Sequence, residues 1–273
     1  MYVGVDIGGT KTLVAVLNDN GEIVEQVKFA TPKNYDHWVL EIKNLALSHL
    51  KHQDFKAGGI GAPGYIDRIH GRMIRQPNLP WKNVPVEGDC EKIFNCPMVL
   101  ENDANVAGLS EAMLHKEADS VLYVTISTGI GTGFVYKQKL DTALLDSEGG
   151  HVLIEHRGIL TTWEKLSAGR MMFKHFGKKV ADIDPSDKAS WKYVAHHIAT
   201  GLLSNIAIFQ PDLVIIGGSV GEQFEYYGDM LQDELDKHKL PVVDIPKVVG
   251  AQRPSLCVIY GCYELAKQTF KHD

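Results

Sequence analysis

Short apolar runs alternate along the chain with longer stretches in which apolar residues recur at helical spacing. The runs Leu13–Leu17, Gly58–Ala62 and Leu122–Ile126 predict buried strands. Residues Lys188 to Phe209 show the longest helical pattern, and the proline at position 211 ends it. Strands that alternate with helices in this way are typical of an α/β fold, and we expect a mixed sheet in each half of the chain.

The same patterns place the other elements. Residues 68–88 contain Pro77, Pro80 and Pro85, so we expect an irregular loop or a small ribbon there rather than a helix. The remaining predicted strands are residues 2–5, 22–29, 98–100, 133–136 and 213–216, and the remaining predicted helices are residues 38–50, 90–95, 103–114, 161–176 with a weak point at Gly169, 224–238 and 256–270.

One kind of loop occurs twice. Asp6-Ile-Gly-Gly-Thr-Lys and Ser127-Thr-Gly-Ile-Gly-Thr-Gly each lie between two predicted strands. Glycines let the main chain approach a ligand closely, and backbone N–H groups with threonine hydroxyls can donate to an anion. A hairpin turn without a ligand is the alternative for either loop alone. Neither matches the dinucleotide or Walker A pattern, because no helix follows directly. The repetition favours two related halves that bind a polyphosphate between them.

Composition excludes several classes of partner. The chain has 273 residues, 44% of them hydrophobic and 23% charged, and a net charge of −6. A sequence pI near 6.0 argues against nucleic acid or an anionic membrane as a partner. No apolar run approaches a membrane span, and no basic region followed by an apolar core opens the chain. The cysteines at 90, 96, 257 and 262 form no Cys-x-x-Cys pair, so we expect a cytoplasmic protein with reduced thiols.

The order of short motifs resembles the ROK group of sugar kinases and repressors, within the actin/sugar kinase/Hsp70 ATPase superfamily. The resemblance extends from Val3 to about Ala266. It implies two ribonuclease-H-like (actin-like ATPase) domains with mixed β-sheets flanked by helices and a cleft between them. The expected domains are residues 1–103 and 104–255, with a closing helix, 256–271, packed on the first. The motifs are Asp6-Ile-Gly-Gly-Thr-Lys, Gly61-Ala-Pro-Gly, Glu101-Asn-Asp-Ala-Asn, Ser127-Thr-Gly-Ile-Gly-Thr-Gly, Glu148-Gly-Gly-His and Gly217-Gly-Ser.

At the nucleotide end, the resemblance implies that both Gly/Thr loops flank the phosphates of ATP. Asp6 would hold Mg²⁺, through water, because a hard cation prefers oxygen ligands and often keeps part of its hydration shell. The turn at Gly217 and Gly218 would pack against adenosine, although an ordinary strand-to-helix turn is an open alternative. The phosphate-binding residues implied are Gly8, Gly9, Thr10, Lys11, Ser127, Thr128, Gly129, Gly131, Thr132 and Gly133.

At the acceptor end, a sugar presents hydroxyls that each donate and accept, so its site needs converging carboxylates, amides and an imidazole. A solvated helix face is the alternative for Glu164, and an ordinary surface or core histidine is the alternative for His151. The sugar-binding residues implied by the resemblance are Asn78, Asn102, Asp103, Glu148, His151 and Glu164.

Asp103 is the predicted general base. Transfer of a γ-phosphoryl group to a hydroxyl requires a carboxylate that accepts the hydroxyl proton. The alternative is that Asp103 caps the helix that follows it, for which Asp is well suited. Asn102 beside it, with Glu148 and His151 downstream, favours the catalytic role.

The chain departs from the family in one respect. Most ROK proteins carry Cys-x-Cys-Gly-x-x-Gly-Cys after the Gly-His pair and bind structural zinc there, whereas residues 151–163 contain no cysteine. A structural zinc site needs four Cys or His ligands, so we predict no zinc. Sugar binding could be altered by this loss. We favour the alternative that Ile154, Ile159, Leu160 and Trp163 replace the metal by packing, which leaves His151 to bind a sugar hydroxyl.

The leading hypothesis is an ATP-dependent hexose kinase of the glucokinase type. Alternatives are a kinase for an acetamido sugar such as N-acetylglucosamine or N-acetylmannosamine, and a catalytically silent sugar sensor. A repressor of the same family would need a DNA-binding segment before the first loop, and only Met1–Val5 precede Asp6. Family analogy alone implies a homodimer.

Overall fold

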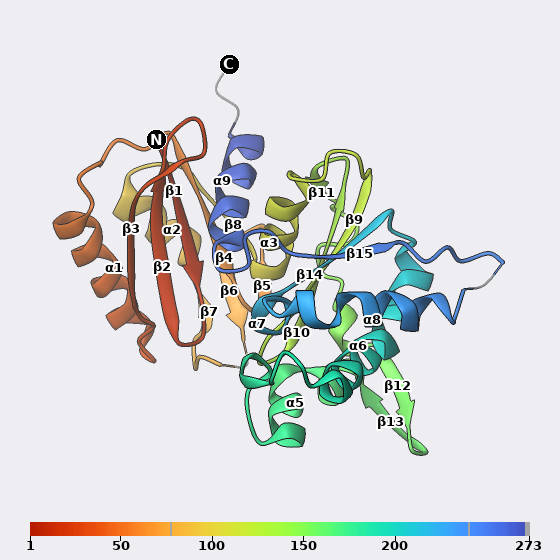
Figure 1. Cartoon of the computed structure of the whole chain (residues 1–273). Helices are drawn as coiled ribbons and strands as arrows, with labels where there is room; N and C mark the ends of the chain where they lie inside the picture. Colours follow the sequence, from red (N-terminus) through yellow and green to blue (C-terminus); the bar gives the residue numbers. More distant parts are fainter. Residues whose placement is uncertain (77, 240, 271–273) are drawn as a thin grey trace. The chain divides into compact units, whose positions relative to one another are not determined.

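Two five-stranded mixed sheets organise the part of the chain that the computed structural model describes, residues 1–76, 78–239 and 241–270. Each sheet belongs to its own compact unit: Met1–Ser110 with the segment from Leu256 form unit 1, and Glu111–Ser255 form unit 2. The strand orders are β3-β2-β1-β4-β8 and β11-β10-β9-β14-β15. Both sheets therefore combine an antiparallel meander with parallel strands, and the predicted α/β fold class with two related halves is confirmed (Figure 1).

Unit 1 is built around the parallel strands at the centre of its sheet. Asp6 of β1 pairs in register with Gly61 of β4, and Ala62 of β4 pairs with Asn102 of β8. The carboxyl ends of these strands consequently meet at one edge of the sheet. The elements are β1 (Tyr2–Ile7), β2 (Lys11–Leu17), β3 (Ile23–Ala30), α1 (Tyr35–His49), β4 (Ala57–Ala62), β5 (Tyr65–Asp67), β6 (Arg72–Arg75), β7 (Lys82–Val84), α2 (Val86–Phe94), β8 (Met98–Asn102), α3 (Asp103–Ala112) and α9 (Cys257–Thr269).

Residues 68–88, predicted as an irregular loop or a small ribbon, form a ribbon as far as residue 84, but residues 86–88 already belong to helix α2. Strands β5, β6 and β7 form a small antiparallel sheet in the order β5-β6-β7. Pro80 lies between two of these strands and Pro85 precedes α2, so neither interrupts the hydrogen bonding of a central strand. Pro77, which the sequence analysis placed in this segment, lies outside the described residues.

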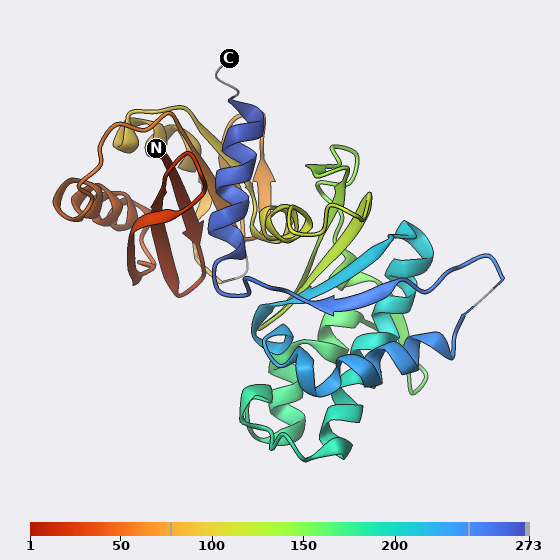
Figure 2. The ribbon, with the colours of Figure 1, turned by 45° about the horizontal axis from the view of Figure 1, so that its top comes forward.

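Helix α9 packs on the sheet of unit 1 and contacts β1, β4 and α3 (Figures 1 and 2). Ile259 and Tyr263 of the helix are buried in a cluster with residues of β1, β2 and β4. The approach depends on glycine: a Cβ at Gly59 would overlap the backbone of Cys262, and one at Gly261 would overlap the carbonyl oxygen of Val106. The predicted helix extends to residue 271, which lies outside the described residues.

A Gly261→Ala substitution tests this close contact. We expect it to lower the free energy of unfolding by about 2–3 kcal/mol, because the new methyl group meets backbone and the helix must move. Gly88 of α2 is the matched control, since a Cβ there meets nothing within 4 Å. Gly88→Ala should stabilise by up to about 1 kcal/mol through helix propensity. Urea titration of both variants measures the effect, and equal stability of the two would contradict the packing described.

Unit 2 contains the longest helix, and its predicted bounds, Lys188–Phe209, agree with the structure. The Asp187 side chain accepts a hydrogen bond from the Ser190 N–H at one end, and Gln210 adopts a left-handed conformation at the other. The elements are β9 (Ser120–Ile126), β10 (Ile130–Tyr136), β11 (Lys139–Leu140), β12 (Leu153–His156), β13 (Ile159–Thr162), α4 (Trp163–Ser167), α5 (Gly169–Phe176), α6 (Lys188–Phe209), β14 (Leu213–Gly217), α7 (Gly218–Gly221), α8 (Phe224–Asp236) and β15 (Lys247–Gly250).

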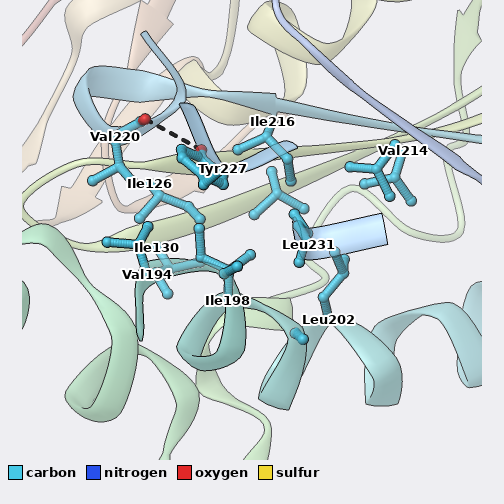
Figure 3. Close-up of a cluster of buried hydrophobic side chains, with 14 of the residues drawn as sticks. Ile126, Ile130, Val194, Ile198, Leu202, Val214, Ile216, Val220, Tyr227 and Leu231 are labelled. Carbon is cyan, nitrogen blue, oxygen red and sulfur yellow. Dashed lines mark hydrogen bonds between the residues drawn. The ribbon is translucent and has the colours of Figure 1, made fainter. Parts of the chain in front are cut away.

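The core of unit 2 lies between its sheet and helices α6 and α8 (Figure 3). Val194, Ile198 and Leu202 recur along one face of α6 and are buried against residues of β9, β14 and α8. The buried hydroxyl of Tyr227 donates to the carbonyl oxygen of Val220 over 3.2 Å, so this polar atom is satisfied inside the core. The apolar periodicity of α6 is thus the pattern of one buried face.

Over residues 150–176 one sequence prediction is wrong and one hairpin was missed, although the predicted weak point at Gly169 agrees with the structure. The single helix predicted over residues 161–176 is instead the end of β13 followed by α4 and α5, which Ala168 separates in an extended conformation. The β12–β13 hairpin was not predicted. Arg157 and Gly158 connect its strands with positive φ angles, as a tight hairpin turn requires.

No helix in the described ranges is both long enough and apolar enough to cross a membrane.

Candidate active site

Two carboxylates lie at the carboxyl edge of the sheet in unit 1. Asp6 is the residue before the last of β1, and Asp103 follows β8 at the first position of α3. The pKa of Asp6 is raised to about 7, first by burial and then by the neighbouring charge of Asp103, against a smaller opposing effect of Lys28. The two acidic groups, nearly a hundred positions apart in sequence, therefore interact through space.

The first Gly/Thr loop is the tight turn between β1 and β2. The Gly8 N–H donates to the carbonyl oxygen of Lys11 over 2.9 Å, and the Thr31 hydroxyl donates to the Gly8 carbonyl over 2.8 Å. Thr10 and Lys11 are exposed at the tip. Asn78 lies against this loop, because a Cβ at Gly9 would be 2.7 Å from the Asn78 Cβ. A predicted phosphate loop and a predicted sugar-binding residue are thus neighbours in unit 1.

Asn102 caps helix α3. Its side-chain oxygen accepts hydrogen bonds from the N–H groups of Ala104 (2.9 Å) and Asn105 (3.4 Å), and its amide nitrogen donates to the Gly64 carbonyl (3.4 Å). The Asp103 carboxylate accepts a hydrogen bond from the N–H of its neighbour Ala104. The sequence left open that Asp103 caps this helix. In the structure Asn102 is the main cap.

The second Gly/Thr loop is the turn from Ser127 to Gly129 between β9 and β10. The Ser127 N–H donates to the Gly129 carbonyl over 2.9 Å and closes the turn, whose tip residue, Thr128, is exposed. Glu164 lies against it: its carboxylate accepts from the Ile130 N–H over 3.1 Å. One carboxylate of the predicted sugar site therefore contacts the predicted phosphate loop within unit 2.

Gly217 and Gly218 lie beside this second loop. Strand β14 runs parallel to β9, and Gly217 pairs in register with Thr125. Gly218 has a φ of +76°, which favours glycine, and the Ser219 N–H donates to the Ser127 hydroxyl oxygen over 3.0 Å. The turn assigned to adenosine and the loop assigned to phosphate are thus joined by a hydrogen bond.

Three of the predicted phosphate-binding residues lie in strand β10 rather than in the turn: Gly131, Thr132 and Gly133. The Thr132 hydroxyl accepts from the buried Gly149 N–H over 2.9 Å. It thereby holds the short helical turn Gly149–His151 against β10. The structure thus gives Thr132 a contact with the acceptor motif, whose ends are Glu148 and His151.

A Thr132→Val substitution tests this contact. It removes the hydroxyl while keeping the shape, so the Gly149 N–H is left buried without its partner, at a cost of about 1–3 kcal/mol. We expect a lower unfolding free energy and a raised KM for the sugar. Thr132→Ser keeps the hydroxyl and is the matched control, measured by urea titration and steady-state kinetics. A sugar KM unchanged in both variants would contradict the prediction that the turn Gly149–His151, which Thr132 supports, helps to bind the sugar.

Glu148 and His151 face solvent. Their side chains are 60% and 56% exposed, and the Glu148 Oε2 and His151 Nδ1 atoms are 3.5 Å apart. Glu164 is less accessible and forms an ion pair with Arg170, whose Nη2 lies 3.0 Å from the Glu164 Oε1. The Arg170 contact was not predicted, since nothing in the local pattern distinguishes it from other surface arginines of helices.

The segment that replaces the family's cysteine cluster is the β12–β13 hairpin. The predicted packing of its apolar residues is observed for Ile154 and Trp163, which join the core of unit 2. The prediction is wrong for Ile159 and Leu160, which are 68% and 69% exposed because the hairpin has no covering layer on that side. Over the described ranges, no group of three or more His, Cys, Asp or Glu side chains is arranged to hold a metal ion.

Sequence reasoning also missed Arg68 and the role of Glu101. Glu101 stands inside a recognised motif, directly before Asn102, so its position was a usable signal. Arg68 lies in a turn of the small ribbon, and no sequence feature links it to Glu101. The structure pairs the two side chains at 2.6 Å.

Comparison with known proteins identifies the fold and the family of this arrangement. Two ribonuclease-H-like sheets, each with a Gly/Thr turn beside acidic or amide side chains, define the actin-like ATPase fold. The family model of the ROK family matches residues 2–268. The chain belongs to the ROK family.

Individual relatives agree with this assignment. The glucokinase of Streptomyces coelicolor is 26% identical, over 98% of this chain and 98% of that protein. The fructokinase of Streptococcus mutans is 27% identical, over 82% of this chain and 81% of that protein. A crystal structure of a ROK family glucokinase from Streptomyces griseus in complex with glucose and AMPPNP superposes with a TM-score of 0.82 at 26% identity, covering 98% of this chain and 99% of that chain.

Proposed function

We propose that this protein transfers the γ-phosphoryl group of ATP to a hydroxyl of a hexose, with Asp103 as the general base. The protein is an enzyme, a phosphotransferase with a sugar hydroxyl as acceptor, as its glucokinase and fructokinase relatives support. The observation that carries the proposed mechanism is the placement of Asp6 and Asp103 at the same edge of one sheet. A nucleotide-binding turn alone would not need the second carboxylate.

In the proposed reaction, the Asp103 carboxylate accepts the proton of the attacking sugar hydroxyl. The hydroxyl oxygen forms a bond to the γ-phosphorus while the bond from that phosphorus to the β,γ-bridging oxygen breaks, and ADP leaves with that oxygen. Asp103 then returns its proton to solvent. Because Asn102 bears the capping hydrogen bonds of α3, the Asp103 side chain is held at the helix start without being the main cap.

The residues fit a hydrated Mg²⁺. Magnesium in kinase sites is held through one or two carboxylates, waters and the substrate phosphates, where it neutralises charge that develops on the phosphate oxygens. Asp6 is a half-buried carboxylate with a pKa raised to about 7, an environment in which a nearby cation favours the ionised form. We propose that Asp6 holds the ion through water.

Backbone donors of both units would position the ATP phosphates. In unit 1 these would come from the Gly8–Lys11 turn, apart from the Gly8 N–H, which donates to Lys11. In unit 2 they would come from the Ser127–Gly129 turn, apart from the Ser127 N–H, which donates to Gly129. The side chains of Asn78, Asn102, Glu148, His151 and Glu164 would bind the sugar. Ion pairing with Arg170 holds Glu164 in place and leaves its second oxygen, Oε2, beside the loop at Gly129.

The identity of the acceptor is the finer part of the proposal. Glucokinases and fructokinases both occur among the relatives, so we propose a hexose as the acceptor, with an acetamido sugar as the alternative. The carboxylates and the imidazole named above suit hydroxyl recognition by either kind of sugar.

Release of ADP from Mg-ATP, measured with a panel of hexoses and acetamidohexoses, tests the function. We expect one or a few hexoses to stimulate ADP release. Mass spectrometry should detect the corresponding hexose phosphate as the product. Stimulation by acetamidohexoses alone would favour the alternative acceptor. Calorimetric binding of a sugar without any ADP release would overturn the kinase proposal in favour of a sensor.

A further inference from the structure

A buried, bidentate ion pair of unit 1 includes Glu101, two positions before the residue proposed as general base. The Arg68 guanidinium donates from Nε to the Glu101 Oε2 and from Nη2 to the Glu101 Oε1, both over 2.6 Å. The Glu101 side chain is 5% exposed and that of Arg68 is 23% exposed. Such a bidentate pair fixes orientation as well as distance, because the planar guanidinium matches both carboxylate oxygens.

The pair joins two segments that are distant in sequence. Arg68 follows β5, in the turn that leads to β6, and Glu101 lies near the end of β8. β5 lies beside β8 in unit 1 (Figure 1). The ion pair therefore attaches the small ribbon to the edge of the sheet at which Asp103 follows.

Glu101 also organises the start of α3. Its Oε1 accepts from the backbone N–H of Asn102 over 2.6 Å and from the side-chain amide of Asn105 over 2.9 Å. Asn102 in turn caps the helix. The carboxylate of Glu101 thus contacts residues on both sides of Asp103, at positions 102 and 105.

We propose that Arg68 and Glu101 are positioning residues for Asp103: the bidentate pair holds the turn Asn102–Asn105 so that the Asp103 carboxylate meets the acceptor hydroxyl. This inference rests on the proposed function, because it assigns the pair a role in the same reaction. A pair that served only to attach the ribbon would affect the stability of unit 1 but not the proton transfer by Asp103.

The test is a double-mutant cycle between Arg68 and Asp103. Arg68→Met should lower kcat by about 10- to 100-fold, since a displacement of about 1 Å at the base costs that much. The KM for ATP should change little. In the Asp103→Asn background, Arg68→Met should leave kcat nearly unchanged, because a group that acts through the base has no effect once the base is absent. Glu101→Gln should behave in the same way.

Stability is measured on the same proteins, because one partner left alone in a buried pair destabilises. Arg68→Lys keeps the charge and loses the second hydrogen bond, so it should fold and still lower kcat. Arg72→Met is the matched control: Arg72 lies on the same ribbon but bonds to Asn83, and its loss should leave kcat unchanged. Additive losses of kcat in the cycle, or a normal kcat in folded Arg68→Met, would overturn the positioning role.

The two proposals fail in different ways. If Asp103→Asn keeps the wild-type kcat, the assignment of the base is wrong. If Asp103→Asn loses activity while Arg68→Met lowers kcat equally in both backgrounds, the base stands and only the positioning role is wrong.

Discussion

The Asp103→Asn variant is expected to lose about 10²–10⁴-fold in kcat for sugar phosphorylation. The amide cannot accept the proton of the attacking hydroxyl, although it has nearly the shape of the carboxylate. An asparagine oxygen can still accept the hydrogen bond from the Ala104 N–H, and Asn102 retains the cap of α3. We therefore expect the unfolding temperature and the KM for ATP to change little. Steady-state kinetics and a thermal melt measure both effects.

Asp36→Asn is a suitable control for this experiment. Asp36 is an exposed carboxylate in the first turn of α1, remote in sequence from every residue of the site. Its loss should leave kcat unchanged. A wild-type kcat in Asp103→Asn would remove Asp103 from the role of base.

Asp6→Asn is expected to make the protein more stable and less active. The pKa of Asp6 is about 7 in the folded protein and near 3.8 as an ordinary Asp. Between these values the folded state holds a proton that the unfolded state has lost, so the free energy of unfolding falls as pH rises through this window. About three pH units correspond to roughly 4 kcal/mol at most. Without Mg²⁺, Asp6→Asn should therefore exceed wild type in stability at pH 8 and resemble it near pH 4.

The activity of Asp6→Asn should move in the opposite direction. Loss of a carboxylate that holds a hydrated cation should lower kcat/KM for Mg-ATP by about 10- to 100-fold. Urea titrations at pH 4.5 and pH 8, with kinetics at neutral pH, measure the two effects. A variant that is less stable than wild type at pH 8 would show that Asp6 is stabilised in its ionised form.

Glu234 is a control for which the pKa shift, and so the expected change in stability, has the opposite sign to that of Asp6. Hydrogen bonds from Lys237 and His196 lower the pKa of Glu234 to about 2. Its stabilising contribution is present above the ordinary pKa of 4.5 and is lost as pH falls through about 2. Glu234→Gln should therefore be less stable than wild type at pH 8, where Asp6→Asn is more stable. Both variants showing the same sign at pH 8 would contradict this account of one of the two carboxylates.

Elements with a strong local pattern could be predicted from sequence. Helix α6 carries its apolar stripe, its cap at Asp187 and its stop before Pro211 within one continuous segment. The strand–turn–strand pairs β1–β2 and β9–β10 are similarly local, since each pair is closed by its own tight turn. The break between α4 and α5 was predicted only as a weak point at Gly169, because the full break depends on a distant partner. There the Gly169 N–H donates to the Ser127 carbonyl of the second loop.

The candidate site, like the fold, was predictable from sequence only where it depends on local motifs. Asp6 and Asp103 could be selected from their motifs, but only the parallel pairing of β1, β4 and β8 places them at one edge of a sheet. The contacts of Thr132 with Gly149 and of Arg68 with Glu101 join residues 17 and 33 positions apart. The helical and strand periodicities of the sequence do not indicate such contacts.

By itself the sequence determined the class of fold, the two related loops and the candidate residues for phosphoryl transfer, because each depends on residue type and spacing within a short segment. The tertiary structure decided how those residues are used. It made Asn102 the helix cap, Thr132 a support for the acceptor turn and Glu101 the centre of a buried ion pair beside Asp103. These roles depend on which backbone and side-chain groups the sheet brings together. Strand pairing between segments that are far apart in sequence decides this, and the local sequence does not encode such pairing.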